Sequence, residues 1–227
     1  MLFCTSYFDT EEVYQKRYRK WIDYYSGHPF CRDKDLFLID DHSDLRLVDG
    51  DIHVIGESEF GCGRAQKINL IHFGERKGGP EAANSAGWYR SFLKSLDLAR
   101  RFGYERIVHA ESDAYLISRR IFDYIEETRF GWTMFWCHLF RFPETGLQVI
   151  CKDQFPLFER FQSKGHDFYV GKMAEWTLPY TRLEAFFNGD RFGEYAGKIG
   201  GDDRIRQVDG MDYYTQCSLN VQIQPES

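Results

Sequence analysis

Two acidic residues, Glu111 and Asp113, stand close together where a short, mostly apolar run from residue 106 to residue 110 ends. In an extended segment, side chains two residues apart point to the same face. Both carboxylates can therefore approach one divalent cation such as Mg²⁺ or Mn²⁺. Ligands of open α/β sheets bind just beyond the carboxyl ends of strands, which is where we expect this pair. The pattern favours a metal-held phosphate, and the alternative is a charged turn that water solvates.

Other polar side chains follow predicted strands in the first half of the chain. Thr5 and Tyr7 end the run 2–8, and Asp40 ends the run 35–39. Tyr7 could stack on a ligand ring or pack in the core, and Asp40 could accept ligand hydrogen bonds or cap a turn. Four further residues flank the same expected crevice: Arg76, Lys77, Asn84 and Arg90. Any one of them could contact a phosphate group or be a solvated surface residue.

The elements that position these residues follow from apolar spacing and from turn signals. Strands are predicted over 2–8, 35–39, 52–55, 68–73 and the run before Glu111. Helices are predicted from Asp9 or Thr10 to about residue 27, over 81–102, 119–127 and 156–161, and in part of 178–187. Segments 132–140 and 147–151 read as an antiparallel hairpin with its turn at 143–146. This order predicts an α/β domain whose mostly parallel sheet carries an antiparallel extension.

Composition narrows the possible classes of protein. A length of 227 residues suits one large domain, and 35 acidic against 29 basic residues give a net charge of -6 without a run of five basic residues. Nucleic acid is therefore not an expected partner. The 6 cysteines lack any C-x-x-C pair, so they are expected to be reduced, mostly buried thiols. With no transmembrane segment predicted, a cytoplasmic location is expected, and peripheral membrane association remains open.

The order of motifs resembles that of the GT-A glycosyltransferase superfamily over about residues 1–118. Thr5-Ser-Tyr-Phe8 is similar to the first-strand segment that cradles the nucleotide base. Leu38-Ile-Asp-Asp-His-Ser-Asp44 is similar to the DDxSxD turn after the second strand, and Glu111-Ser-Asp113 to the metal-binding DxD, with Glu in place of the first Asp. The resemblance implies a GT-A-like single domain with a Rossmann-like, mostly parallel sheet flanked by helices. Residues 1–118 would form its nucleotide-sugar-binding half and residues 119–227 its acceptor-binding half.

The function that the resemblance implies is transfer of a sugar from a nucleotide diphosphate donor to a hydroxyl of a glycan or other acceptor, with Mn²⁺ or Mg²⁺. The charge that develops on the leaving diphosphate needs a divalent metal or cationic side chains. Asp113 is expected to bind the metal. Glu111 is expected to bind it directly, through water, or to turn toward the ribose. Asp40 is expected to contact the base or ribose, and Tyr7 to stack on the base.

The acceptor side has several candidate residues. An inverting transferase needs a carboxylate that takes the acceptor's proton, and Glu175 lies beside Trp176, whose ring could stack on a sugar. Glu175 could equally be a solvent-facing acid, and Asp202 and Asp203 are rivals for the catalytic role. His109 is expected to be a core histidine. Many enzymes of the resembling fold add a C-terminal His to the metal shell, but the last histidine here is His166.

Two other functions remain open. A nucleotidyltransferase also needs a metal and a similar sheet, but the chain shows no Gly-rich first loop with Arg or Lys for a triphosphate. A non-catalytic sugar- or protein-binding domain could use the same scaffold. Metal-dependent binding of a nucleoside diphosphate separates the transferase from this binding domain.

Overall fold

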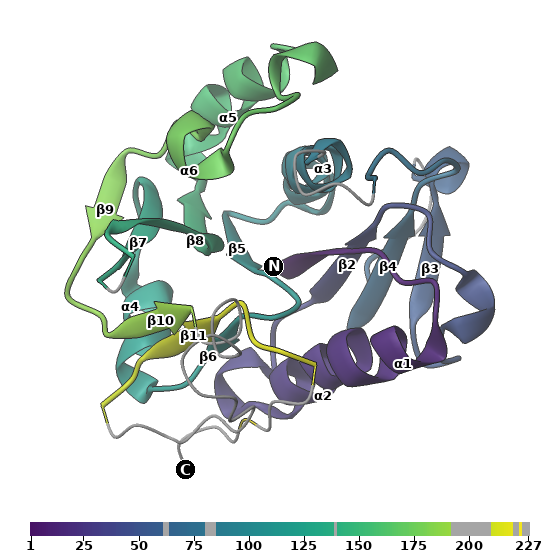
Figure 1. Ribbon diagram of the computed structural model, residues 1–227, viewed down its shortest axis with the longest axis horizontal. Coiled ribbons are helices and arrows are strands. Elements are labelled where there is room, and N and C mark those ends of the chain that lie inside the picture. The colour runs from purple at the N-terminus through teal and green to yellow at the C-terminus, as the bar shows by residue number, and fades with distance from the viewer. Residues whose placement is uncertain (61–63, 80–84, 139, 192–209, 220–222, 224–227) are drawn as a thin grey trace.

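The computed structural model of the chain describes residues 1–60, 64–79, 85–138, 140–191, 210–219 and 223. Its largest element is a twisted sheet of eight strands with helices on both faces (Figure 1). In sheet order the strands are β3 (His53–Gly56), β4 (Ile68–His72), β2 (Leu36–Asp40), β1 (Leu2–Ser6), β5 (Arg106–Ala110), β8 (Phe142–Cys151), β7 (Trp132–Cys137) and β9 (Arg182–Glu184).

The sheet has a parallel half and a mixed half. From β3 to β5 all neighbouring strands are parallel, whereas β8 is antiparallel to both β5 and β7. All five residues of β2 are buried, as expected for a parallel strand covered on both faces. The predicted α/β class, with a mostly parallel sheet and an antiparallel extension, is confirmed.

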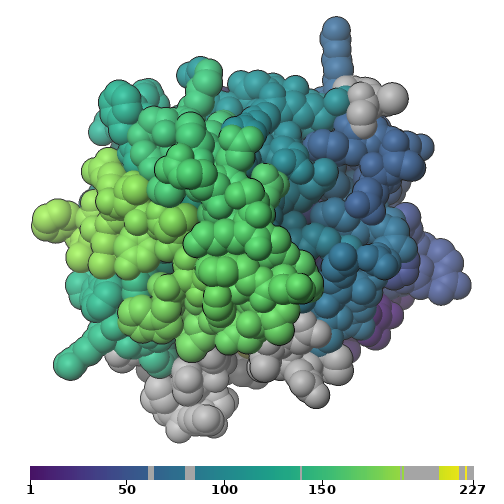
Figure 2. Space-filling view, turned by 90° about the horizontal axis from the view of Figure 1, so that it is seen from above, coloured from purple at the N-terminus to yellow at the C-terminus, as the bar shows by residue number. Residues whose placement is uncertain are grey.

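Helices cover the two faces of the sheet. A continuous helical segment on one face comprises α1 (Glu11–Val13), the π-helical η1 (Tyr14–Arg19) and α2 (Lys20–Gly27), and α4 (Arg119–Glu127) lies on the same face. The opposite face carries α3 (Ala86–Phe102), α5 (Phe155–Gln162) and the short α6 (Ala174–Thr177). Figure 2 shows this second side of the molecule, with the green chain around α5 and α6 beside the teal α3. Each side of the sheet therefore carries a buried apolar cluster.

Local sequence signals fix several helix ends as predicted. Thr10 Oγ1 accepts the Val13 N–H at 3.3 Å, and Ser118 Oγ accepts the Ile121 N–H at 3.3 Å, so each is an N-cap. Gly103 ends α3 in the left-handed region at φ 73°, which glycine adopts at no steric cost. These ends need no tertiary contact.

The prediction of a hairpin turn at 143–146 is wrong. The chain turns between Cys137 and Phe142, and 143–146 lies inside β8. Pairing of β7 with β8 shifts there, because Met134 faces Gln148 whereas Phe135 faces Glu144. Residues 145–147 therefore bulge out of register. The buried Glu144 carboxylate accepts the Gly146 N–H at 2.7 Å and closes this bend within the strand.

The C-terminal part of the chain differs most from expectation. Within 178–187, where helical pieces were predicted, the structure has β9, which pairs in parallel with β7. The free edge of β7 decides this conformation, because strand preference depends on context. A second sheet, in the order β10 (Gly189–Arg191), β11 (Tyr213–Thr215), β6 (Tyr115–Leu116), was not predicted, since two- and three-residue strands carry no periodicity. Among the described residues, no helix is long and apolar enough to cross a membrane.

Candidate functional site

A cavity of about 360 Å³ opens at the carboxyl ends of β1 and β5. Strand order changes direction here, because β2 follows β1 on one side and β5 pairs with β1 on the other, and such points bind ligands in open α/β sheets. Loops after β2 and β4, the first turns of α3, the π-helical η1 and the bulge of β8 complete the wall. The charged and aromatic side chains that line it are Tyr7, Arg17, Tyr18, Asp41, Arg76, Trp88, Glu111 and Asp113.

The acid pair lies on a turn and not on an extended strand. β5 ends at Ala110, and the Ala114 N–H bonds to the Glu111 carbonyl at 2.7 Å. The β8 bulge holds this turn through the Glu111 N–H, which lies 2.8 Å from the Gly146 carbonyl oxygen. The predicted extended geometry at 111–113 is therefore wrong, because these contacts bend the chain. Both carboxylates nevertheless line the cavity.

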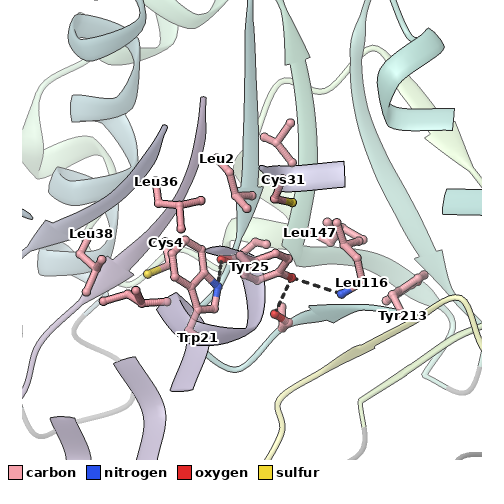
Figure 3. Packing of buried hydrophobic residues seen from close by; sticks show 14 of the residues in the cluster. Leu2, Cys4, Trp21, Tyr25, Cys31, Leu36, Leu38, Leu116, Leu147 and Tyr213 are labelled. Atoms are coloured by element: carbon pink, nitrogen blue, oxygen red, sulfur yellow. Dashed lines mark hydrogen bonds between the residues drawn. The ribbon is translucent and has the colours of Figure 1, made fainter. Parts of the chain in front are cut away.

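Helix α2 anchors the two ends of this acidic turn (Figure 3). The Trp21 indole N–H donates to the Ala110 carbonyl at 3.1 Å. The Tyr25 hydroxyl donates to the Ala114 carbonyl at 2.9 Å and accepts the Leu116 N–H at 3.2 Å. Since Trp21 and Tyr25 are fully buried, the turn is fixed from the core side.

Glu111 is held by three hydrogen-bond donors. Trp88 Nε1 and His109 Nε2 lie 2.5 and 2.7 Å from its Oε1, and the Thr5 hydroxyl lies 3.0 and 2.9 Å from the two carboxylate oxygens. Burial alone would raise the pKa of Glu111, but the neighbouring His109 ring and the hydrogen bonds from His109, Trp88 and Thr5 outweigh it and lower the pKa. Glu111 is therefore an ionised carboxylate with a defined orientation.

Asp113 is paired less completely. Arg17 Nη1 lies 3.2 Å from its Oδ2. Burial raises the pKa of Asp113 to about 6, with nearby Glu111 and Glu144 adding to the rise and Arg17 opposing it. A buried carboxylate among other carboxylates gains from an additional cation.

Tyr7 lines the cavity and is not a core residue. The Arg76 guanidinium carbon lies 3.6 Å from the Tyr7 ring centroid, and Arg76 Nη1 donates to the Tyr7 hydroxyl at 2.7 Å. Cation–π contact of this kind holds a guanidinium flat on a ring. A base that stacks on Tyr7 must therefore use the other ring face, or Arg76 must move.

Asp40 lies inside the protein, beneath the cavity. Its side chain is 0% exposed and accepts hydrogen bonds from Ser6 Oγ at 3.1 Å and Ser43 N at 2.8 Å, and His72 Nδ1 lies at 2.9 Å. These contacts are those of a turn cap. These contacts do not test the donor-binding role predicted for Asp40, but they favour a structural role. The neighbouring Asp41 is the residue that reaches the cavity wall.

Asp41 joins the loop after β4 to the start of α3. Its carboxylate accepts the Lys77 and Gly78 N–H groups at 3.1 and 2.6 Å and pairs with Arg90. A Cβ on Gly87 would lie 2.3 Å from Asp41 Oδ2, so only glycine fits there. Of the four residues predicted to flank the crevice, Arg76 lines the cavity, Arg90 and Lys77 fix the loop, and Asn84 lies outside the described residues.

Glu175 lies next to the cavity wall within a charged network. Its Oε1 is 3.1 Å from Arg191 Nη2 and 3.5 Å from the hydroxyl of Thr145, which lines the cavity. Arg191 Nε also pairs with the fully buried Glu144 at 2.7 Å. The network places Glu175 behind Thr145 at the edge of the cavity, and its catalytic role stays a prediction. Asp202 and Asp203 lie outside the described residues.

The donor set fits a hard cation that a phosphorylated ligand helps to bind. Within the described residues no group of three or more His, Cys, Asp or Glu side chains could hold a metal ion. Mg²⁺ usually binds through one or two carboxylates, several waters and substrate phosphates, and Asp113 with Glu111 meets that requirement. Arg17 must share Asp113 with such an ion.

Several residues of the site escaped the sequence prediction. They are Arg17 in η1, Trp88 at the start of α3, Thr145 and Gly146 in the β8 bulge, and Gln216 after β11. In the sequence, Arg17 is next to the apolar positions of the predicted helix. That position indicates only that it lies at the border of the buried helix face. Gln216, at φ 55°, reaches the site because the Cys217 N–H bonds to the Asp113 carbonyl at 3.0 Å. No spacing signal could have found these five.

Comparison with known proteins gives matches in structure only. No family model and no curated protein matches the chain. One similar solved structure is a glycosyltransferase involved in glycosylation of the major capsid of PBCV-1, with 13% identity over 96% of this chain and 92% of that chain and a TM-score of 0.48. Another is the galactosyltransferase LgtC with donor and acceptor sugar analogues, with 9% identity over 96% and 87% of the two chains and a TM-score of 0.49. At TM-scores below 0.5, the function has to be derived from the residues of the cavity itself.

Proposed function

We propose that this chain transfers a sugar from a nucleoside diphosphate donor to a hydroxyl group, with a divalent cation at Asp113 and Glu111. The observation that carries the proposal is the cavity at the β1–β5 switch point, where the partly buried carboxylates of Glu111 and Asp113, two arginines and Tyr7 converge. Carboxylates alone would repel a diphosphate. A cation between them and the phosphates, together with Arg17 and Arg76, makes that ligand fit.

Each part of a sugar nucleotide has a place in this proposal. The base lies toward Tyr7 and Arg76, the ribose toward Thr5 and Glu111, and the diphosphate toward Asp113 and Arg17. The bound cation supplies charge stabilisation to the leaving diphosphate. The sugar then lies toward Thr145, on the side where Glu175 is found.

In the transfer step, the bond from the sugar carbon to the diphosphate oxygen breaks and the acceptor oxygen bonds to that carbon. The nucleoside diphosphate leaves with the bonding electrons, and Glu175 takes the acceptor's hydroxyl proton if configuration inverts. In the described part of the chain, Glu175 contacts Arg191 and Thr145 through Oε1. Its Oε2 would then be the oxygen that accepts the proton.

The test is release of nucleoside diphosphate from a panel of sugar nucleotides with Mn²⁺, in the presence of sugar acceptors. We expect turnover with at least one donor, loss of turnover in EDTA, and loss in Asp113→Asn, a nearly isosteric change that removes a charge from the cation site. Asp123→Asn, on the exposed side of α4, is the matched control and should retain full activity. Absence of both turnover and metal-dependent binding of a nucleoside diphosphate would instead support a non-catalytic sugar- or protein-binding domain.

A further inference from the structure

A row of buried polar side chains leads across the sheet to Glu111. Trp132 on β7, Gln148 on β8 and His109 on β5 are each 0% exposed. The Trp132 indole N–H donates to Gln148 Oε1 at 2.8 Å, Gln148 Nε2 lies 3.3 Å from His109 Nδ1, and His109 Nε2 lies 2.7 Å from Glu111 Oε1. This row of side chains connects the mixed half of the sheet to the cavity.

Trp132 fixes the direction of every hydrogen bond in this row. An indole N–H only donates, so Gln148 must present its oxygen to Trp132 and its amide nitrogen to His109. The two amide hydrogens then point to the Thr145 carbonyl, at 2.8 Å, and to His109 Nδ1. Since Nδ1 must accept, the ring proton lies on Nε2 and is donated to Glu111. These hydrogen-bond partners thus determine the tautomer of His109.

Packing keeps the His109 ring in this orientation. Phe3 stacks on it at 4.7 Å between centroids, and Phe92 meets it edge-on at 5.2 Å. The Nε2–H of His109 and the indole N–H of Trp88 together hold Oε1 of Glu111. Within the described chain Oε2 contacts Thr5, so it is the oxygen that a cation would approach.

We propose that Gln148 is a positioning residue of the site, which acts through the His109 tautomer to hold Glu111 in the orientation that receives a divalent cation with a nucleoside diphosphate. The cation part of this inference rests on the proposed function. Residues that orient metal ligands from outside the coordination shell typically change metal affinity about 10–100-fold when replaced. Gln148 does not touch the ligand in this proposal, so its effect must pass through the ring proton.

The experiment replaces Gln148 with Met, which has a similar volume but no N–H to donate to Nδ1. Two quantities are measured at pH 8: the ¹⁵N NMR signals of the His109 ring without metal, and the affinity for Mn²⁺ in the presence of UDP by calorimetry. We expect the Nε2–H tautomer in the unaltered protein and a mixture with Nδ1–H in Gln148→Met. We also expect Mn²⁺ to bind about 10–100-fold more weakly to the variant.

Two further variants separate positioning from general damage to the core. Thr133→Val is the matched control, because Thr133 is also 0% exposed on β7 and adjoins Trp132. It should leave both the tautomer and the affinity unchanged. Trp132→Phe keeps Gln148 but removes the N–H donor that orients its amide. The Gln148 amide can then flip, and the Nδ1–H tautomer of His109 should appear. This variant tests the proposal should Gln148→Met not fold.

Different results test the positioning role of Gln148 and the proposed cation site. A proton on Nδ1 in the unaltered protein, or full Mn²⁺ affinity in a Gln148→Met protein whose tautomer has shifted, would overturn the positioning role. If the unaltered protein shows the Nε2–H form but binds no Mn²⁺ with UDP, the proposed function fails and the cation part of the inference fails with it. The tautomer result would then still support the hydrogen-bonded row.

Discussion

At the scale of residues, the two acids of the turn have opposite electrostatic environments. Three donors stabilise the ionised form of Glu111, whereas burial disfavours the charge of Asp113 and leaves Arg17 as its cationic partner in the described chain. Such a carboxylate lowers the stability of the empty protein and gains most from a bound cation. Asp113 therefore lowers the stability of the empty protein and raises its affinity for a cation.

The pH dependence of stability follows from this difference. The pKa of Asp113 is raised from 3.8 to about 6, so between these pH values the folded state binds a proton that the unfolded state has lost. Stability should fall as pH rises through about 4–6, by roughly 2–3 kcal/mol. In Asp113→Asn this loss should vanish. Urea unfolding at pH 4, 6 and 8 in EDTA measures it, with Asp123→Asn as control, and equal pH profiles for Asp113→Asn and unaltered protein would contradict the shift.

Asp40 should behave as a structural residue. Replacing it with Ala leaves the Ser43 N–H and His72 without their buried acceptor, which should lower the free energy of unfolding by about 2–4 kcal/mol. The donor Michaelis constant should change little once the variant is measured below its melting temperature. A large rise in that constant at unchanged stability would instead return Asp40 to the donor site.

Glu175→Gln tests the acceptor side. If Glu175 takes the proton in an inverting transfer, turnover should fall about a hundredfold or more at saturating donor and acceptor, with donor affinity preserved. Glu105→Gln, at an exposed position paired with Lys152, is the control. Near-normal turnover would exclude Glu175 as the base and direct attention to Asp202 and Asp203.

At the scale of elements, the site depends on close approaches between loops and helix ends. The loop after β2 meets the start of α3 so closely that the Asp41 carboxylate occupies the space of a side chain at Gly87. The bulge in β8 likewise delivers the Gly146 carbonyl to the backbone of the acidic turn. Both contacts set where Trp88 and Glu111 lie relative to each other.

Gly87→Ala should therefore damage the site. The added Cβ would lie 2.3 Å from Asp41 Oδ2 and 2.7 Å from the Gly78 nitrogen, so the loop or α3 must shift. We expect a loss of about 1–3 kcal/mol in unfolding free energy and weaker nucleotide binding. Gly50→Ala, with no atom within 4 Å of the added Cβ, should be nearly neutral in both chemical unfolding and binding; equal behaviour of the two variants would argue against the close approach.

At the scale of the whole molecule, ligand binding should be visible as global stabilisation. The cavity joins segments from residue 5 to residue 216, so a ligand that binds it should stabilise the native state as a unit. A nucleoside diphosphate with Mn²⁺ at about 100 times its dissociation constant adds about 2.7 kcal/mol. For a chain of this size that is a rise in Tm of about 5–10 °C.

Differential scanning fluorimetry measures this shift. Mn²⁺ alone should stabilise the protein less than Mn²⁺ with nucleotide, because two carboxylates bind the ion weakly without phosphate oxygens. EDTA and Asp113→Asn should each remove the shift. A rise with nucleotide that is equally large in EDTA would contradict a cation at the acidic turn.

The sequence by itself determined the elements whose signals are local. Apolar runs of four to seven residues predicted the parallel strands, and the caps Thr10, Ser118 and Gly103 marked helix ends, because these depend on neighbours within four residues. The motifs at Thr5, Tyr7, Glu111 and Asp113 pointed to residues that share one cavity, since parallel strands present their carboxyl ends at the same edge.

Tertiary structure alone decided the remainder. Whether 143–146 turns or bulges depends on the buried Glu144 carboxylate, and whether 182–184 forms a strand depends on the free edge of β7. Arg17 meets Asp113 across 96 residues, and Gln148 orients His109 from a strand 39 residues away. Such contacts join segments distant in sequence, so their geometry exists only once the chain is folded. For the same reason Asp40, one residue before the cavity wall, lies beneath it while Asp41 lines it.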